Sequence, residues 1–137
     1  MQVRDGMSPV VLCVGPAHTV RAAARLMADR GVGAAIVIDP DGHGPGILTE
    51  RDILRSVGAG EDPDRELVAD HLTAEVVFAS PDWPLEEAAA VMSRGGFRHL
   101  IVVEGGEPVG VLSVRDILRC WTSDGASSPV LSGASAS

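Results

Sequence analysis

The sequence is poor in aromatic residues, and it lacks lysine and tyrosine altogether. Only two Phe and two Trp occur among its 137 residues, which leaves few of the aromatic platforms on which single-stranded nucleic acids stack. The formal net charge of −8 also opposes attraction to a phosphate backbone. We therefore expect no nucleic-acid partner. All eleven cationic side chains are arginines, which suit bidentate phosphate contacts, although a compositional bias of the source genome explains this more simply.

Long hydrophobic runs are missing too. No apolar run approaches the ~20 residues that span a bilayer. The opening stretch, MQVRDGMSPVV, has neither the apolar core nor the cleavage site of a signal peptide. We expect a cytoplasmic protein with no membrane partner.

Potential metal ligands and nucleophiles are few and scattered. Cys13 and Cys120 match no metal-binding spacing, and we expect both to be reduced and buried as small hydrophobic residues. His18, His43 and His71 are isolated along the sequence, and we expect them at the surface. The sequence has no nucleophile elbow, no zinc signature and no Walker loop. It therefore predicts no catalytic residue, no metal and no enzymatic activity.

The sequence does contain a twelve-residue motif that occurs twice. GILTERDILRSV at 46–57 and GVLSVRDILRCW at 110–121 are identical at seven of twelve positions. Similarity continues upstream at an offset of 65 residues, and one loop, DPDGHGPG, is a residue longer than its counterpart EGGEPVG. Insertions fall in loops because loops tolerate them. A copy of about half the chain would be a marginal domain alone, so two copies could share one core.

Each copy predicts the order strand, helix, strand, strand, helix. The first strands are expected at Val10–Val14 and Val76–Ala79. The apolar runs AAIVID and LIVVE are typical of buried strands, and short Gly-rich loops lead from them to GILT and GVLS, as in hairpins. The last helices carry these apolar residues: Ile53, Leu54, Val57, Ile117, Leu118 and Trp121.

Helix boundaries are marked by capping residues. Thr19 predicts the start of the first helix and Gly31 its end. In the second copy Pro84 opens the equivalent helix, and the pair Gly95-Gly96 ends it. The predicted division of the chain is a first repeat at 1–60, a linker at 61–66, a second repeat at 67–122 and a disordered, dispensable tail at 123–137.

Both copies place T-x-x-D or S-x-x-D at the start of the last helix. One explanation is structural: Thr49 and Ser113 cap the helix, while Asp52 and Asp116 favour its positive end. The other is functional. A helix start offers amides to a phosphate, and a carboxylate one turn inward can accept both hydroxyls of a ribose. The structural explanation suffices for either copy taken alone, so a single such motif is weak evidence of function. The preceding glycine leaves room for a ligand.

The paired motifs resemble those of tandem cystathionine-β-synthase (CBS) domains. The resemblance covers about 120 residues and rests on G-h-h-[ST]-x-x-D-h-h in both copies, M-S or L-T before the first strand, and A-A-x-x-M in the first helix. It implies an α+β fold, in which two β-α-β-β-α repeats pack around a pseudo-twofold axis and leave two clefts. This sequence has Ile36 and Ile101 where the family often has proline.

The resemblance also implies a ligand and the residues that bind it. Many members bind AMP, ADP or ATP, and others bind S-adenosylmethionine; NAD is a further candidate here. The motif acid holds the ribose and the motif hydroxyl faces the phosphate. Ser8 and Thr73 would close the clefts from the opposite repeat. Arg98 and His99 would reach phosphate, where the first copy has Gly33 and Ala34; taken without the resemblance, they indicate a solvated strand end. The implied binding residues are Asp116, Ser113, Arg98, His99, Asp52, Thr49, Ser8 and Thr73.

Members of this family usually regulate an attached enzyme or channel. No attached domain is recognisable here, so we expect a regulatory sensor that binds an adenine nucleotide and acts on a separate, unidentified protein. We also expect a homodimer, because Trp121 lies on a helix that need not be covered within one pair of repeats. The alternative is an assembly module that dimerises and binds no ligand.

Overall fold

The computed structural model describes residues 1–42 and 44–123. His43 and residues 124–137, which include nearly all of the predicted tail, lie outside the described residues. The described chain forms two compact units. The N-unit is Pro9–Val77, and the C-unit combines Met1–Ser8 with the residues from Phe78 onward.

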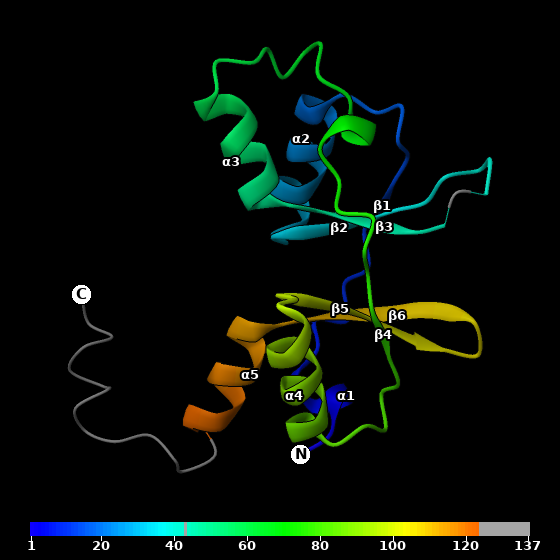
Figure 1. Cartoon of the computed structure of the whole chain (residues 1–137), viewed down its shortest axis with the longest axis vertical. Coiled ribbons are helices and arrows are strands. Elements are labelled where there is room, and N and C mark those ends of the chain that lie inside the picture. Colours follow the sequence, from blue (N-terminus) through cyan, green and yellow to red (C-terminus); the bar gives the residue numbers. More distant parts are fainter. Residues whose placement is uncertain (43, 124–137) are drawn as a thin grey trace. The chain divides into compact units, whose positions relative to one another are not determined.

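The N-unit is a three-stranded sheet with its helices on one face (Figure 1). Strand β2 lies in the middle, parallel to β1 and antiparallel to β3. The helix between the parallel strands makes this a βαβ unit, and a hairpin then leads to β3. The elements are β1 (Cys13–Val14), α2 (Val20–Arg30), β2 (Ala34–Val37), β3 (Gly46–Thr49), α3 (Glu50–Gly58) and the 3₁₀ helix η1 (Val68–Asp70).

The C-unit repeats this topology. Strand β5 is parallel to β4 and antiparallel to β6, with an irregularity between Val102 and Val103. Both large helices lie on one face of the sheet, and a short N-terminal helix packs against them (Figure 1). The elements are α1 (Val3–Gly6), β4 (Phe78–Ala79), α4 (Leu85–Gly95), β5 (His99–Glu104), β6 (Glu107–Ser113) and α5 (Val114–Trp121). The predicted α+β class and element order are confirmed, while α1 was not predicted.

The predicted helix boundaries are confirmed by their capping geometry. The side chain of Thr19 accepts a hydrogen bond from the amide of Ala22 at 3.1 Å. Gly31 and Gly96 end α2 and α4 with φ angles of 67° and 71°, a left-handed conformation that glycine adopts without strain. Pro84 precedes the first residue of α4.

Helices α2 and α4 bury equivalent residues, and these form the cores with the central strands. The spacing i, i+3, i+7 places them on one face of each helix. Leu48 and Leu112 hold equivalent positions on β3 and β6, and neither side chain is exposed. The buried residues are Val20, Ala23 and Met27 on α2, and Leu85, Ala88 and Met92 on α4.

Helices α3 and α5 leave part of their apolar residues exposed. Leu54 is 72% exposed and Leu118 54%. The inward positions are taken by Ser56 in α3 and by Ile117 and Cys120 in α5. The last helices therefore carry more apolar surface than their own units cover.

Each sheet is completed by a segment from the other sequence copy. Ser8 donates to and accepts from Val111 of β6, at 2.9 and 3.1 Å. Thr73 exchanges the equivalent pair with Ile47 of β3, at 2.8 and 2.9 Å. The sequence repeats and the compact units are therefore different divisions of the same chain.

Three expectations are corrected. Strands β1 and β4 are shorter than the predicted Val10–Val14 and Val76–Ala79, although the carbonyl of Leu12 still accepts from the amide of Ile36. Both cysteines are free, but only Cys120 is buried, while Cys13 is exposed. His18 is exposed, as expected, whereas His71 is half-buried. Within 1–42 and 44–123, no helix is long and apolar enough to cross a bilayer.

Candidate functional site

The N-unit motif lies where β3 passes directly into α3. Thr49 ends the strand and caps the helix, and its hydroxyl accepts from the amide of Asp52 at 3.2 Å. Oδ2 of Asp52 accepts in return from the Thr49 amide at 2.9 Å and from the Thr49 hydroxyl at 3.0 Å. Both side chains are half-buried. This reciprocal pair is a capping box.

The C-unit motif has the same backbone arrangement with one added ion pair. The hydroxyl of Ser113 accepts from the Asp116 amide at 3.0 Å, and Oδ2 of Asp116 accepts from the Ser113 amide at 2.8 Å. Oδ1 of Asp116 accepts from the guanidinium of Arg119 at 2.5 Å. The Asp116 side chain is only 13% exposed. A carboxylate has about four acceptor sites, so this one keeps room for further donors.

Most of the amides at these helix starts already have partners. An α-helix begins with four amides that lack partners within the helix. In α3, the capping-box bonds satisfy the amides of Thr49 and Asp52, and the carbonyl of Gly33 accepts from the amide of Glu50 at 2.9 Å. The C-unit repeats this, with the carbonyl of Arg98 accepting from Val114 at 3.0 Å. A phosphate here would depend on side chains more than the sequence suggested.

The glycine before each motif has a packing role. A Cβ atom on Gly46 would lie 2.9 Å from the backbone oxygen of Thr73, and one on Gly110 would lie 2.7 Å from that of Ser8. Both distances are too short for any side chain, because the opposing atoms belong to the backbone. The sequence predicts that these glycines leave room for a ligand. The structure instead shows that each admits the segment that completes the sheet.

The flanking residues differ most between the two motifs. Gly33 and Arg98 hold equivalent positions, because the carbonyl of each accepts from the amide of the first residue of the last helix in its unit. The side chain of Arg98 is exposed. His99 pairs in register with Ser113, where Ala34 pairs with Thr49. The first residue of the helix is Glu50 in the N-unit and Val114 in the C-unit. A Cβ atom built on Gly33 would meet the Glu50 carboxyl group at 3.2–3.4 Å, so this acid lies against the backbone at Gly33.

The structure gathers the predicted residues into two sets, one per unit. In the N-unit, Thr73 is paired with β3, which ends at Thr49, one turn before Asp52. The C-unit brings together the remaining five: Ser8, Arg98, His99, Ser113 and Asp116.

Sequence reasoning missed two charged neighbours of these sets. Glu50 occupies the first x of T-x-x-D, and Arg119 lies three residues after Asp116. Glu50 could have been found by comparing the copies position by position for charge, because it aligns with Val114. Arg119 could not, because it aligns with Arg55 of the N-unit, and only the structure shows its ion pair with Asp116. The motif alone draws attention only to what the copies share.

The CBS domain family model matches this chain twice, at residues 2–59 and 68–122. The chain belongs to the CBS domain family. Each match contains one complete G-h-h-[ST]-x-x-D motif. The resemblance inferred from the paired motifs is thereby confirmed as family membership.

Relatives include whole proteins of different length. The CBS domain-containing protein YhcV of Bacillus subtilis is 34% identical over 116 residues, which cover 84% of this chain and 81% of that protein. Protein MJ1225 of Methanocaldococcus jannaschii is 30% identical over 124 residues, which cover 90% of this chain but 44% of that protein. The chain thus spans less than half the length of some relatives.

Solved structures of CBS proteins share the fold. A hexameric CBS-CP12 protein from bloom-forming cyanobacteria superimposes with a TM-score of 0.81 at 29% identity, covering 94% of this chain and 75% of that one. A CBS domain protein from Pyrobaculum aerophilum, solved in complex with AMP, gives a TM-score of 0.72 at 29% identity, covering 90% of this chain and 99% of that one.

Proposed function

We propose that this CBS pair is a regulatory module that binds an adenine nucleotide and transmits its occupancy to a separate protein. The proposal rests on one observation above all: a half-buried acid and hydroxyl lie at the start of a helix in both units, and one pair is flanked by Arg98 and His99. The AMP complex of the similar Pyrobaculum protein supports the ligand class. We propose no catalytic role for any residue.

The charges around the C-unit motif suit a nucleoside phosphate. Asp116 is acceptor-only and suits the two hydroxyls of a ribose. Arg98 is an exposed cation whose planar group matches phosphate geometry. Because most helix-start amides are already bonded, the guanidinium carries the larger share of phosphate recognition. AMP, ADP and ATP fit a site in which Asp116 binds the ribose and Arg98 binds the phosphate. S-adenosylmethionine and NAD are the second choice.

A calorimetric panel tests the proposal. AMP, ADP, ATP, NAD, S-adenosylmethionine and adenosine are titrated into the full chain, with melting temperature as an independent measure, since a ligand that binds only the folded state raises it. We expect at least one adenine nucleotide to bind with saturable heat and to raise the melting temperature. If none binds at millimolar concentration, the sensor function is excluded.

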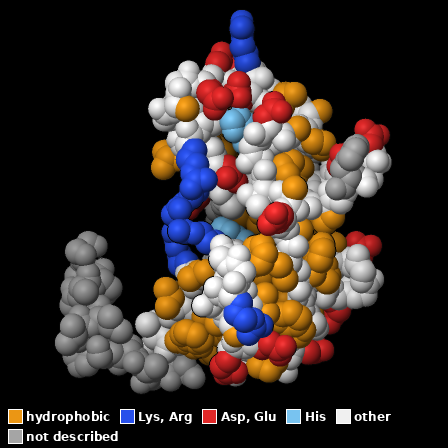
Figure 2. All heavy atoms as spheres, in the orientation of Figure 1, with side chains coloured by type: hydrophobic (Ala, Val, Ile, Leu, Met, Phe, Trp, Pro, Cys, Tyr) orange, Lys and Arg blue, Asp and Glu red, His pale blue; other side chains and the backbone are white. Residues whose placement is uncertain are grey.

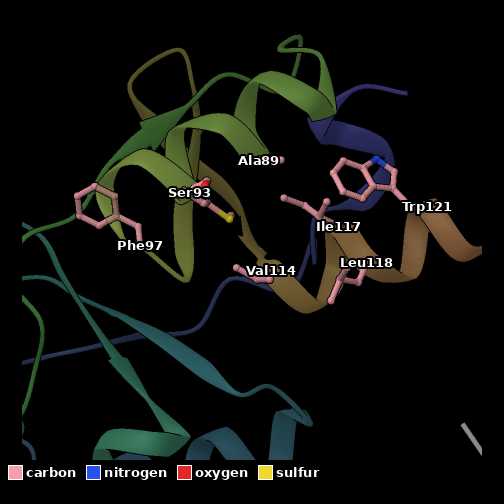
Figure 3. Close-up of a pocket in the computed structure, with 8 residues that line it drawn as sticks. Ala89, Ser93, Phe97, Val114, Ile117, Leu118 and Trp121 are labelled. Carbon is pink, nitrogen blue, oxygen red and sulfur yellow. The ribbon is translucent and has the colours of Figure 1, made fainter. Parts of the chain in front are cut away.

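We also propose a homodimer formed through the exposed apolar residues of the C-unit. Helices α4 and α5 enclose an apolar hollow of about 190 Å³ (Figure 3). Two of its lining residues, Leu118 and Trp121, are 54% and 40% exposed. Exposed apolar patches of this kind often mark protein–protein contacts. Trp121→Ser should shift the chain toward a monomer mass in light scattering; a wild-type monomer at tens of micromolar would contradict the dimer.

The same surface favours a second candidate function, an assembly module without a ligand. The hollow is apolar and contains none of the eight candidate binding residues, so assembly through it does not require a nucleotide. The hexameric CBS-CP12 neighbour supports assembly as a role for this fold. A stable oligomer that binds no adenine nucleotide in the panel would favour this function over the sensor.

A further inference from the structure

Two glutamates and a histidine converge in the loop that follows α3. Glu61, Glu66 and His71 all belong to the N-unit, and one ligand atom of each lies within 4.8 Å of the other two. Nε2 of His71 is 2.8 Å from a carboxylate oxygen of Glu66 and 3.8 Å from one of Glu61. This group is separate from the motif residues, and the CBS motif does not account for it.

The imidazole is held inside a strongly acidic surface. The side chains of His71, Glu66 and Glu61 are 16%, 28% and 39% exposed, so the group opens to solvent on the Glu61 side. From Glu61 to His71 the loop carries five acids and one arginine. Figure 2 shows a histidine side chain among acidic side chains on the surface. Such a concentration of negative charge attracts a cation.

The loop is fixed by backbone hydrogen bonds to the start of α2. The carbonyl of Glu66 accepts from the amide of Val20 at 2.8 Å, and the backbone carbonyl of His18 accepts from the amide of Val68 at 2.9 Å. Val68 is completely buried and anchors η1, which ends immediately before His71. The three side chains therefore project from a preorganised backbone, which lowers the entropic cost of binding.

We propose that Glu61, Glu66 and His71 form a binding site for a divalent transition-metal cation of the zinc class. One imidazole nitrogen and two carboxylates suit Zn²⁺, which commonly takes three protein ligands and a water molecule. Tetrahedral ligands at zinc distances lie about 3.3 Å apart, and the separations of 2.8 and 3.8 Å from Nε2 of His71 fall on either side of this value. Mg²⁺ and Ca²⁺ prefer oxygen ligands alone and suit the site less.

The sequence did not predict this site, because it treated His71 as one of several isolated histidines. Glu61 and Glu66 are the first and last residues of the segment predicted as a linker. The spacing of these glutamates and His71 matches no zinc signature. At the repeat offset of 65 residues, Glu66 and His71 align with Met1 and Gly6, and neither of these supplies a carboxylate or an imidazole. The site therefore belongs to the N-unit alone, and it is independent of the proposed nucleotide.

The test titrates Zn²⁺ and Co²⁺ into the full chain without an affinity tag. We expect one equivalent of Zn²⁺ to bind with saturable heat, and bound Co²⁺ to give the visible absorption of a low-coordinate site. Glu66→Gln and His71→Gln should weaken Zn²⁺ binding by at least about tenfold, since even outer-shell changes cost that much.

Two further variants separate metal binding from stability and from general charge. Glu61→Gln should weaken Zn²⁺ binding but leave the metal-free melting temperature unchanged, because Glu61 is the most exposed of the three. Asp70→Asn removes a charge from the same loop outside the triad, and it should weaken binding less than any ligand variant. The proposal is overturned if Zn²⁺ gives no saturable binding, or if Asp70→Asn weakens it as much as Glu66→Gln does. AMP titrations on Glu61→Gln test nucleotide binding separately.

Discussion

The two motifs share a backbone framework but differ in the charges around it. In both, a capping box joins the last strand to the last helix, and a glycine admits the segment that completes the sheet. Around that framework, the N-unit places the carboxyl group of Glu50 beside Gly33. At the equivalent place the C-unit has Arg98, whose carbonyl accepts from the amide of Val114. One site is thus flanked by an anion and the other by a cation.

This comparison separates what the fold requires from what a ligand would require. The bonds of the capping box satisfy the helix start in both copies, so the motif has a structural function whether or not a nucleotide binds. The flanking charges contribute nothing to those bonds through their side chains, and they are where the copies diverge. Differences in ligand affinity should therefore be determined by the flanks, and the shared acid should determine whether any adenosyl ligand binds.

The largest expected effect comes from removing the acid of the favoured site. Asp116→Ala should abolish the tighter adenine-nucleotide binding event in calorimetry, because the ribose loses its carboxylate acceptor. Asp52→Ala is the matched control and should spare that event. Loss of the tighter event in Asp52→Ala would reverse the ranking of the two sites, and would indicate that the ion pair of Asp116 with Arg119 blocks the C-unit acid.

The next effect comes from the cation. Arg98→Ala should weaken AMP binding by about tenfold or more, since a hydrogen bond to a charged group contributes about 1.5–3 kcal/mol. Adenosine binding should change little, because adenosine has no phosphate. The difference between the AMP and adenosine titrations isolates the contact. Equal losses for both ligands would show that Arg98 supports the site rather than the phosphate.

A smaller effect should follow from exchanging the first helix residue. Glu50→Val should strengthen AMP binding at the N-unit by roughly twofold to fivefold, as expected for one exposed charge interaction. The reciprocal change, Val114→Glu, should weaken AMP binding at the C-unit by a similar factor, and both effects should diminish in high salt. Effects that are insensitive to salt would mean that packing, and not charge, distinguishes the sites.

The last prediction concerns the caps, and it bears on stability rather than on ligand affinity. Thr49→Ala and Ser113→Ala should each lower the free energy of unfolding by about 1 kcal/mol, the usual cost of losing an N-cap side chain. Chemical denaturation measures this loss, and Thr19→Ala, which removes a cap that belongs to neither motif, provides the control. A loss confined to one motif variant would show that the two capping boxes are not equivalent.

The sequence predicted most of the fold because its signals are local and occur twice. Thr19, Gly31 and Pro84 mark helix ends by chemistry that needs no tertiary information. The family resemblance implied only that Ser8 closes a cleft from the opposite repeat. Its pairing with β6 was not predicted, because a contact between residues about 100 positions apart leaves no local pattern. Helix α1 was missed because four residues are too few to show a helical period.

The candidate sites were predicted less evenly. The acids and hydroxyls follow from the motif, but the role of Gly46 and Gly110 was interpreted wrongly, since a close backbone contact and an open space both require glycine. Glu66 and His71 were not connected, because their ligand atoms meet only once η1 turns the chain. Spacing rules detect ligand sets built on one regular element, and this one is built on an irregular loop.

The pairing of Ser8 with Val111 has a consequence for synthesis on the ribosome. Pro9–Val77 is a continuous stretch, so the N-unit can fold as soon as it leaves the exit tunnel. The C-unit joins the first eight residues to the last strand and helix, and its contacts therefore span most of the chain. Pairings of such long range form slowly. The Met1–Ser8 segment must therefore wait until β6 has been made, and during that interval Ser8 has no strand to pair with.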